Sequence, residues 1–243
     1  MQMVNNFLEA LYPVFCELCG LRSHRRLPLC SACQARMAPN NHSCQRCALP
    51  LPPSATSAPR LCGGCQQQLP SYTRVLAPWL YDEHMAFLMH RWKFMGEQRL
   101  SGLLAGLWLE QLASAPTVDA IVPVPLHWRR LCHRGFNQSE LLCHQLRRQN
   151  PLLRAAKLWA GLVSRRRTTA TQSSLDASHR SDNLRGAFEV CHPCDGLRLA
   201  IVDDVMTTGS TVDALAKVLC TAGAASVEVW CIARTPAPGV SPH

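Results

Sequence analysis

Apolar residues in the last two thirds of the chain form short continuous runs that alternate with helically spaced segments. The runs predict strands at Val75–Tyr81, Ala120–Val124, Leu199–Val202 and Val227–Ile232, of which the second and third are expected to be buried. The spaced segments predict helices over Glu83–Phe94, Leu100–Leu112 and Gln138–Arg148, and a last helix from Ser210 or Thr211 to a stop at Gly223. Alternating strands and helices predict an α/β fold, with a parallel sheet flanked by helices and a ligand site beyond the carboxyl ends of its strands.

The first 65 residues hold eight cysteines in four Cys-x-x-Cys pairs, with gaps of 10, 10 and 14 residues between successive pairs. Because two such pairs complete a tetrahedral thiolate site, four pairs predict two structural zinc sites. Redox-active pairs are the weaker interpretation, since a redox motif normally occurs once, beside a βαβ unit. Sequential use of the pairs needs only short loops, and an interleaved arrangement stays open. The expected zinc ligands are Cys16, Cys19, Cys30, Cys33, Cys44, Cys47, Cys62 and Cys65.

Length and composition limit the class of protein. A chain of 243 residues, 47% apolar and 17% charged, can bury one sizeable core and carry a smaller module. The polar stretch 66–71 predicts a boundary, which gives a small double zinc-ribbon module over 1–70, an α/β domain over 71–234 and a loose tail over 235–243. The longest apolar stretch, Leu100 to Leu109, is half a membrane span, and the first fifteen residues lack the positive charge of a signal peptide. We therefore expect no membrane span and a cytoplasmic location.

The formal charge of +9 is concentrated in one part of the chain. Residues 125–180 hold 11 Lys and Arg against 2 Asp and Glu, a net +9 by themselves. Such a stretch is either a solvated face or a surface for phosphates, on a nucleotide or along nucleic acid.

The segment Leu199–Thr211 carries the strongest candidate chemistry. An apolar strand ends in two adjacent acids, and a loop of hydroxyl residues with one glycine leads into a helix. Backbone N–H groups at a helix start, with hydroxyls beside them, form a cradle for a phosphate dianion, and glycine lets the backbone approach it. The acids fit beside a phosphate when they bind sugar hydroxyls or a Mg²⁺ ion that bridges to the ligand. An acidic helix cap alone would not require two acids and this loop.

This segment resembles the phosphoribosyl-pyrophosphate (PRPP) signature of type I phosphoribosyltransferases. The resemblance assigns Asp203 and Asp204 to the ribose hydroxyls of PRPP, which is bound with Mg²⁺. It assigns the 5′-phosphate to Thr207, Thr208, Gly209, Ser210 and Thr211. Three further segments, Val122–Pro125, Arg134–Ser139 and Gly186–Phe188, resemble the ComF family of competence and DNA-utilisation proteins, including its GntX-type members. In that family a zinc-ribbon module precedes a type I phosphoribosyltransferase-like domain, as the cysteine pairs do here.

The family resemblance also implies a pyrophosphate-side loop over 125–135 and a hood over 165–185, both inside the basic stretch. Arg134, Arg165 and Arg180 are the candidate phosphate contacts. The loop begins with the bulky run Pro125–Arg130, whereas active members of the wider class use small residues there, so transfer chemistry stays open.

The favoured hypothesis is a PRPP-binding protein in DNA uptake that handles internalised single-stranded DNA. Aromatic residues such as Trp128 and Phe136 either present exposed rings on which bases could stack or pack against the sheet, and packing is the favoured interpretation for them. The alternative is an active Mg²⁺-dependent phosphoribosyltransferase for an unidentified base or amine. A third hypothesis makes the zinc module a docking surface for partner proteins, such as those of the DNA-uptake machinery, and the PRPP domain a vestige. The sequence assigns no catalytic residue.

Overall fold

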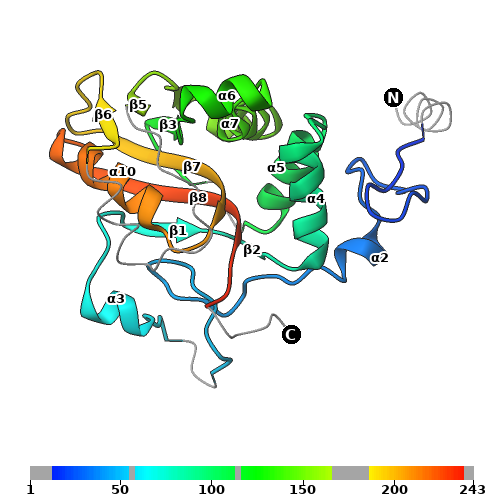
Figure 1. Cartoon of the computed structure of the whole chain (residues 1–243). Helices are drawn as coiled ribbons and strands as arrows, with labels where there is room; N and C mark the ends of the chain where they lie inside the picture. Colours follow the sequence, from blue (N-terminus) through cyan, green and yellow to red (C-terminus); the bar gives the residue numbers. More distant parts are fainter. Residues whose placement is uncertain (1–12, 55–57, 113–115, 166–185, 238–243) are drawn as a thin grey trace.

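A parallel sheet stands at the centre of the fold, in the order β1–β8–β7–β3–β4 with β2 also beside β8 (Figure 1). The computed structural model describes residues 13–54, 58–112, 116–165 and 186–237. The sheet strands are β1 (Arg74–Leu76), β2 (Trp79–Leu80), β3 (Ala120–Pro123), β4 (Lys157–Leu158), β7 (Arg198–Met206) and β8 (Ser226–Arg234). A separate two-stranded antiparallel sheet pairs β5 (Val163–Arg165) with β6 (Phe188–Val190). The helices within the described ranges are α2 (Ser31–Gln34), α3 (Gly63–Gln67), α4 (Glu83–Phe94), α5 (Leu100–Glu110), α6 (Trp128–Arg134), α7 (Gln138–Gln149), α8 (Pro151–Arg154) and α10 (Ser210–Thr221).

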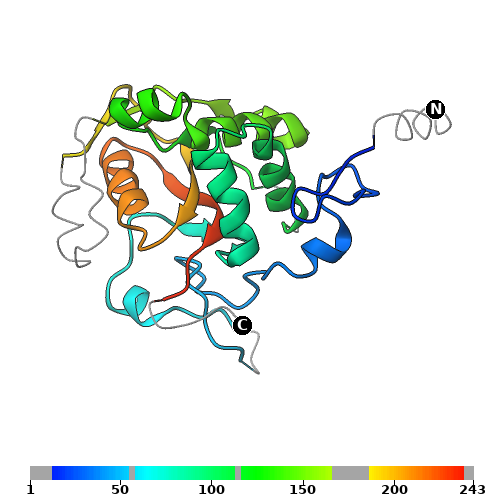
Figure 2. The same ribbon diagram turned by 45° about the vertical axis from the view of Figure 1, so that its right-hand side comes forward.

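The central strands divide the apolar interior into two cores. On β7, Ala200 and Val202 pack with α4, α5 and α7, while Leu199 and Ile201 pack with α10. Because successive side chains of a strand point to opposite faces, the sheet lies between two helical layers (Figure 2). The predicted parallel α/β sheet with flanking helices is therefore confirmed.

The two halves of the cysteine-rich segment join different cores. Cys16 and Cys33 are buried with α4 and α5, whereas Cys44 and Cys65 are buried with the residues around β1 and α10. Between the halves, residues 38–40 run antiparallel to β2. The N–H of Asn40 donates to the carbonyl of Pro78 at 2.8 Å, and that of Leu80 donates to the carbonyl of Ala38 at 2.9 Å. The segment thus packs along the α/β unit at two separate places (Figure 1).

Most predicted elements form close to their expected bounds, and α4 has the bounds predicted. Asp82 caps α4, accepting the N–H of Met85 at 2.7 Å. The strand predicted over Val75–Tyr81 is instead divided into β1 and β2, because Pro78 has no N–H to continue the ladder.

Two expectations outside the sheet need correction. The loop predicted over 125–135 contains α6, since no glycine interrupts the chain before Gly135. The tail predicted to be loose from residue 235 begins with an ordered contact, the N–H of Thr235 donating to the carbonyl of Met206 at 3.0 Å. Residues 238–243 lie outside the described ranges. In the part of the chain that the structure describes, no helix has the length and apolar character to cross a membrane.

Candidate functional site

Two adjacent carboxylates stand near the carboxyl end of β7, the middle strand of the sheet. An oxygen of Asp203 accepts the N–H of Asp204 at 2.9 Å and faces the hydroxyl of Ser139, in the first turn of α7, at 3.4 Å. An oxygen of Asp204 accepts the N–H of Val205 at 2.6 Å and pairs with the ammonium of Lys93, on α4, at 2.8 Å. Each carboxylate is therefore held by its own strand and by a different helix.

The two acids have different electrostatic environments. Burial raises the pKa of Asp203 to about 7, and the charge of Asp204 adds to the rise, while the Asp204 N–H, Lys93 and Ser139 oppose it. Lys93 lies in the last turn of α4, where the helix dipole favours a cation. Carboxylates held in this way can accept hydrogen bonds from neighbouring hydroxyl groups of a sugar.

The loop after β7 presents hydroxyl groups and a helix start beside these acids. The backbone of Gly209 has φ 82°, a conformation that residues with a side chain rarely adopt. A Cβ atom at this position would also collide with Cε of Met206. The hydroxyls of Thr208 and Ser210 lie 3.0 Å apart. As the N-cap residue of the twelve-residue α10, Gly209 brings no side chain to cover the first-turn N–H groups. These groups can meet an anion.

The buried guanidinium of Arg234, at the end of β8, fastens this loop from inside. It donates to the carbonyls of Met206 at 3.0 Å, Thr207, and Thr235 at 2.8 Å. It also donates to the carbonyl of Cys47 at 3.1 Å. The Arg234 guanidinium therefore links the candidate phosphate loop to Cys47, one of the four predicted zinc ligands between Cys44 and Cys65. Sequence reasoning missed Arg234, although a charged residue that ends an apolar strand was a visible signal.

The predicted Arg134–Ser139 motif connects β3 to the acids. The side-chain amide of Asn137 donates to the carbonyl of Val124 at 3.1 Å, and its oxygen accepts the N–H of Ser139 at 3.0 Å, capping α7. Ser139 in turn reaches Asp203. The two interpretations of the aromatic residues divide between them: the Phe136 ring is buried, next to the positive-φ residue Gly135, whereas Trp128 is exposed.

Two of the candidate phosphate contacts lie over aromatic rings. Arg134 stands 5.1 Å from the ring centre of Phe94, and Arg165 stands 5.6 Å from that of Phe188. Arg180 lies outside the described residues. Contact of these arginines with phosphate stays a prediction.

The eight predicted zinc ligands form two compact groups. Within each group the Sγ atoms all lie within 4.8 Å of one another, including Cys19 and Cys30 at 3.9 Å and Cys47 and Cys62 at 3.6 Å. Four sulfurs bonded to zinc at about 2.3 Å stand about 3.8 Å apart in a tetrahedron, so both groups fit a structural Zn²⁺ ion. The sequential arrangement is the one that forms, with Cys16, Cys19, Cys30 and Cys33 in one group and Cys44, Cys47, Cys62 and Cys65 in the other.

Sequence relatives identify the family of this chain. Residues 7–66 match the double zinc ribbon domain family. A purine phosphoribosyltransferase from Pyrococcus horikoshii aligns at a TM-score of only 0.32, with 18% identity over 62% of this chain and 80% of that one. The competence protein F of Haemophilus influenzae is 33% identical over 85% of this chain and 90% of its own length. The DNA utilization protein YhgH of Salmonella typhi is 38% identical over 92% of this chain and 98% of its own length. The chain therefore belongs to the ComF family of competence and DNA utilization proteins.

Proposed function

We propose that this protein binds PRPP or a related ribose phosphate beside the carboxyl end of β7 and uses that site in DNA utilisation. The observation that carries the proposal is the convergence of the two acids with the Thr207–Thr211 loop. Ser139 and Lys93 hold the acids in place, so that their oxygens are preorganised for the two ribose hydroxyls. The first-turn N–H groups of α10 and the loop hydroxyls would receive the 5′-phosphate.

Magnesium would enter this site together with PRPP. Phosphate and carboxylate oxygens are the ligands that Mg²⁺ prefers, and the ion would offset the charge of the pyrophosphate. Asp204 already has the Lys93 ammonium at 2.8 Å. We therefore assign the acids to the ribose and expect the pyrophosphate to bring its own Mg²⁺.

The proposed biological role is the handling of internalised single-stranded DNA during natural competence. Relatives of this chain are named DNA utilization protein and competence protein F. The basic stretch 125–180 supports contact with nucleic-acid phosphates, because its sequence contains 11 Lys and Arg residues but only 2 Asp and Glu residues.

Calorimetric titration of PRPP and Mg²⁺ into the zinc-loaded protein tests the proposed site. We expect saturable binding that is lost in the Asp203→Ala/Asp204→Ala variant. Asp119→Ala is the matched control, because it removes a carboxylate away from the proposed site. Asp119 pairs with Arg198, which precedes Asp203 by five residues on β7, about 16 Å along the strand. Absence of binding to the wild type, or equal loss in the Asp119 variant, would contradict the proposal.

The second candidate function is an active Mg²⁺-dependent phosphoribosyltransferase acting on a base or amine. The combined acid pair and phosphate loop favours it, since these groups would hold the ribose during transfer. Release of pyrophosphate from PRPP that depends on an added base or amine would support this activity. No release across a broad panel, from a protein that binds PRPP, would leave binding as the function.

A further inference from the structure

An exposed strip of apolar side chains begins one residue from the candidate ribose site. Phe94 and Met95, at the end of α4, are 65% and 63% exposed, and Trp128 and Leu131, on α6, are 62% and 42% exposed. They account for four of the ten large hydrophobic side chains exposed within the described ranges. Folding has not buried this strip, which therefore offers contact area to a partner.

Phe94 connects the two helices of the strip. The guanidinium carbon of Arg134, on α6, stands 5.1 Å from the centre of the Phe94 ring. The ring of His90, one turn earlier on α4, is 5.3 Å away and tilted by 41°. Lys93, the residue before Phe94, forms the 2.8 Å ion pair with Asp204. The ring is therefore exposed, supported by a cationic group, and close to the candidate site.

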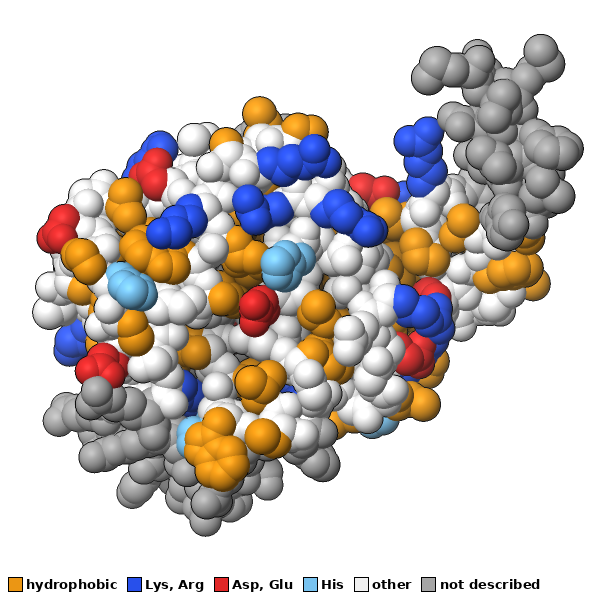
Figure 3. Space-filling view, turned by 90° about the horizontal axis from the view of Figure 1, so that it is seen from above, with side chains coloured by type: hydrophobic (Ala, Val, Ile, Leu, Met, Phe, Trp, Pro, Cys, Tyr) orange, Lys and Arg blue, Asp and Glu red, His pale blue; other side chains and the backbone are white. Residues whose placement is uncertain are grey.

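This chemistry fits a planar ligand better than an aliphatic one. Bases of single-stranded nucleic acid stack on aromatic rings and on guanidinium planes, and nearby cations attract their phosphates. Trp128 precedes Arg134 by six residues, about 9 Å along α6, and supplies a second exposed ring on that helix. The face of the molecule that includes α6 and α7 carries basic and apolar side chains next to one another (Figure 3).

We propose that Phe94, supported by Arg134 and His90, is a stacking site for a base of single-stranded DNA, and that Trp128 takes a second base of the same strand. The inference rests on the DNA-handling part of the proposed function. It places the strand beside the ribose-phosphate site and does not require PRPP to bind.

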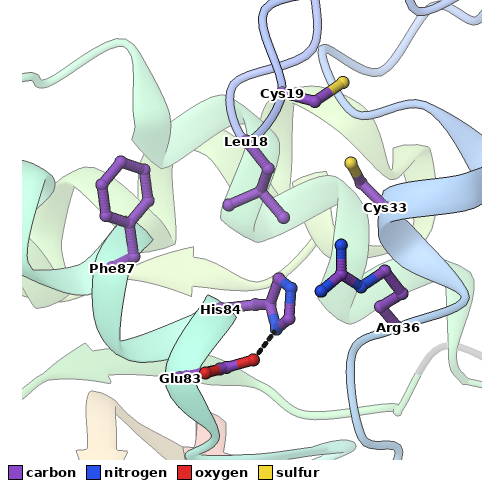
Figure 4. Close-up of a pocket in the computed structure, with 7 residues that line it drawn as sticks. All are labelled: Leu18, Cys19, Cys33, Arg36, Glu83, His84 and Phe87. Carbon is purple, nitrogen blue, oxygen red and sulfur yellow. Dashed lines mark ion pairs between the residues drawn. The ribbon is translucent and has the colours of Figure 1, made fainter.

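Phe87 provides a matched control on the same helix. It is 49% exposed and also has an arginine over its ring, with the guanidinium carbon of Arg91 at 5.4 Å. Arg91 also pairs with Glu17 at 2.9 Å and Glu97 at 2.6 Å. Phe87 lies two turns before Phe94, about 10 Å along α4, and lines a cavity on another part of the surface. This cavity, of about 270 Å³, lies between the first cysteine group and the start of α4 (Figure 4).

Fluorescence anisotropy of a labelled oligothymidylate about 15 nucleotides long, with the full zinc-loaded chain, tests the stacking site. We expect Phe94→Ala to bind roughly 5- to 150-fold more weakly than the wild type, the range that loss of one stacked base produces. Phe94→Tyr should retain affinity because it keeps the ring, and Phe87→Ala should bind as the wild type does. Circular dichroism checks that every variant is folded. Equal affinities for Phe94→Ala and Phe87→Ala, or no binding by the wild type, would overturn the proposal.

Two further arms identify the source of any negative result. Anionic phosphatidylglycerol vesicles test a lipid surface as the occupant of the strip. Vesicle binding that depends on Phe94, with oligonucleotide binding that does not, would overturn the proposal. Titration of PRPP into the wild type and the Phe87 variant tests the ribose-phosphate site separately. Its failure would refute that site, while the oligonucleotide result would still decide the role of Phe94.

Discussion

Removal of the Arg234 guanidinium should destabilise the protein strongly and loosen the second cysteine group. Arg234→Met keeps much of the aliphatic length but removes every donor to four carbonyl groups. Two of these hydrogen bonds, to Cys47 and Met206, are buried. A hydrogen bond to a charged group contributes about 1.5–3 kcal/mol, so the two buried bonds give an expected loss of about 3–6 kcal/mol.

Urea unfolding of the zinc-loaded protein measures this loss. Arg74→Met is the control, because Arg74 also lies beside β8 but forms a largely exposed 3.0 Å pair with Glu228. A surface pair of this kind contributes about 1 kcal/mol or less. A chromogenic chelator should also withdraw zinc faster from the Arg234 variant, because Cys47 loses its anchor. A difference below about 1 kcal/mol between the two variants would refute the reasoning, since it would mean that water replaces the guanidinium without cost.

Three further outcomes follow from the site. Gly209→Ala forces a side chain to φ 82°, at about 1–2 kcal/mol, so thermal unfolding should show lower stability and calorimetry weaker PRPP binding; Gly63→Ala, where a Cβ meets nothing within 4 Å, should change neither. Because burial raises the pKa of Asp203 from 3.8 to about 7, the folded state binds more protons than the unfolded state between these values, and stability falls as pH rises through this window. The unfolding free energy of Asp203→Asn should therefore change less than that of the wild type from about pH 5 to about pH 7, and an equal slope would count against the shifted pKa. Native mass spectrometry should find two zinc ions in the wild type and one in either Cys33→Ser or Cys65→Ser, and an unchanged count of two in both would contradict the two-group assignment.

The parts of the fold that were predictable are those that local chemistry determines. The start of α10 follows from the hydroxyl residues after the glycine, and the apolar residues at helical spacing that follow, Val212, Leu215, Ala216 and Leu219, are all buried. The cysteine spacing likewise predicted both zinc groups, because each Cys-x-x-Cys pair forms a local turn. The two acids were identified for the same reason, since they end an apolar strand and precede a phosphate-type loop.

The partners of those acids depend on contacts between distant parts of the chain. Ser139 reaches Asp203 from 64 positions away, and Arg234 reaches Cys47 across 187. No local pattern marks such pairs, because strand order and helix packing bring them together. The exposure of Phe94 also could not be predicted from the sequence. Phe94 follows the buried apolar residues of α4, and nothing in that pattern indicates that the helix ends beside the two acids.

A crystal structure of the zinc-loaded protein with PRPP and Mg²⁺ would show whether the acids and the loop bind the ligand. The account predicts that the 5′-phosphate lies against the Thr207–Thr211 loop and the first turn of α10, with both ribose hydroxyls at Asp203 and Asp204. Lys93 should remain beside Asp204 in that complex. PRPP bound elsewhere on the molecule, with the acids and the loop unchanged, would contradict the account.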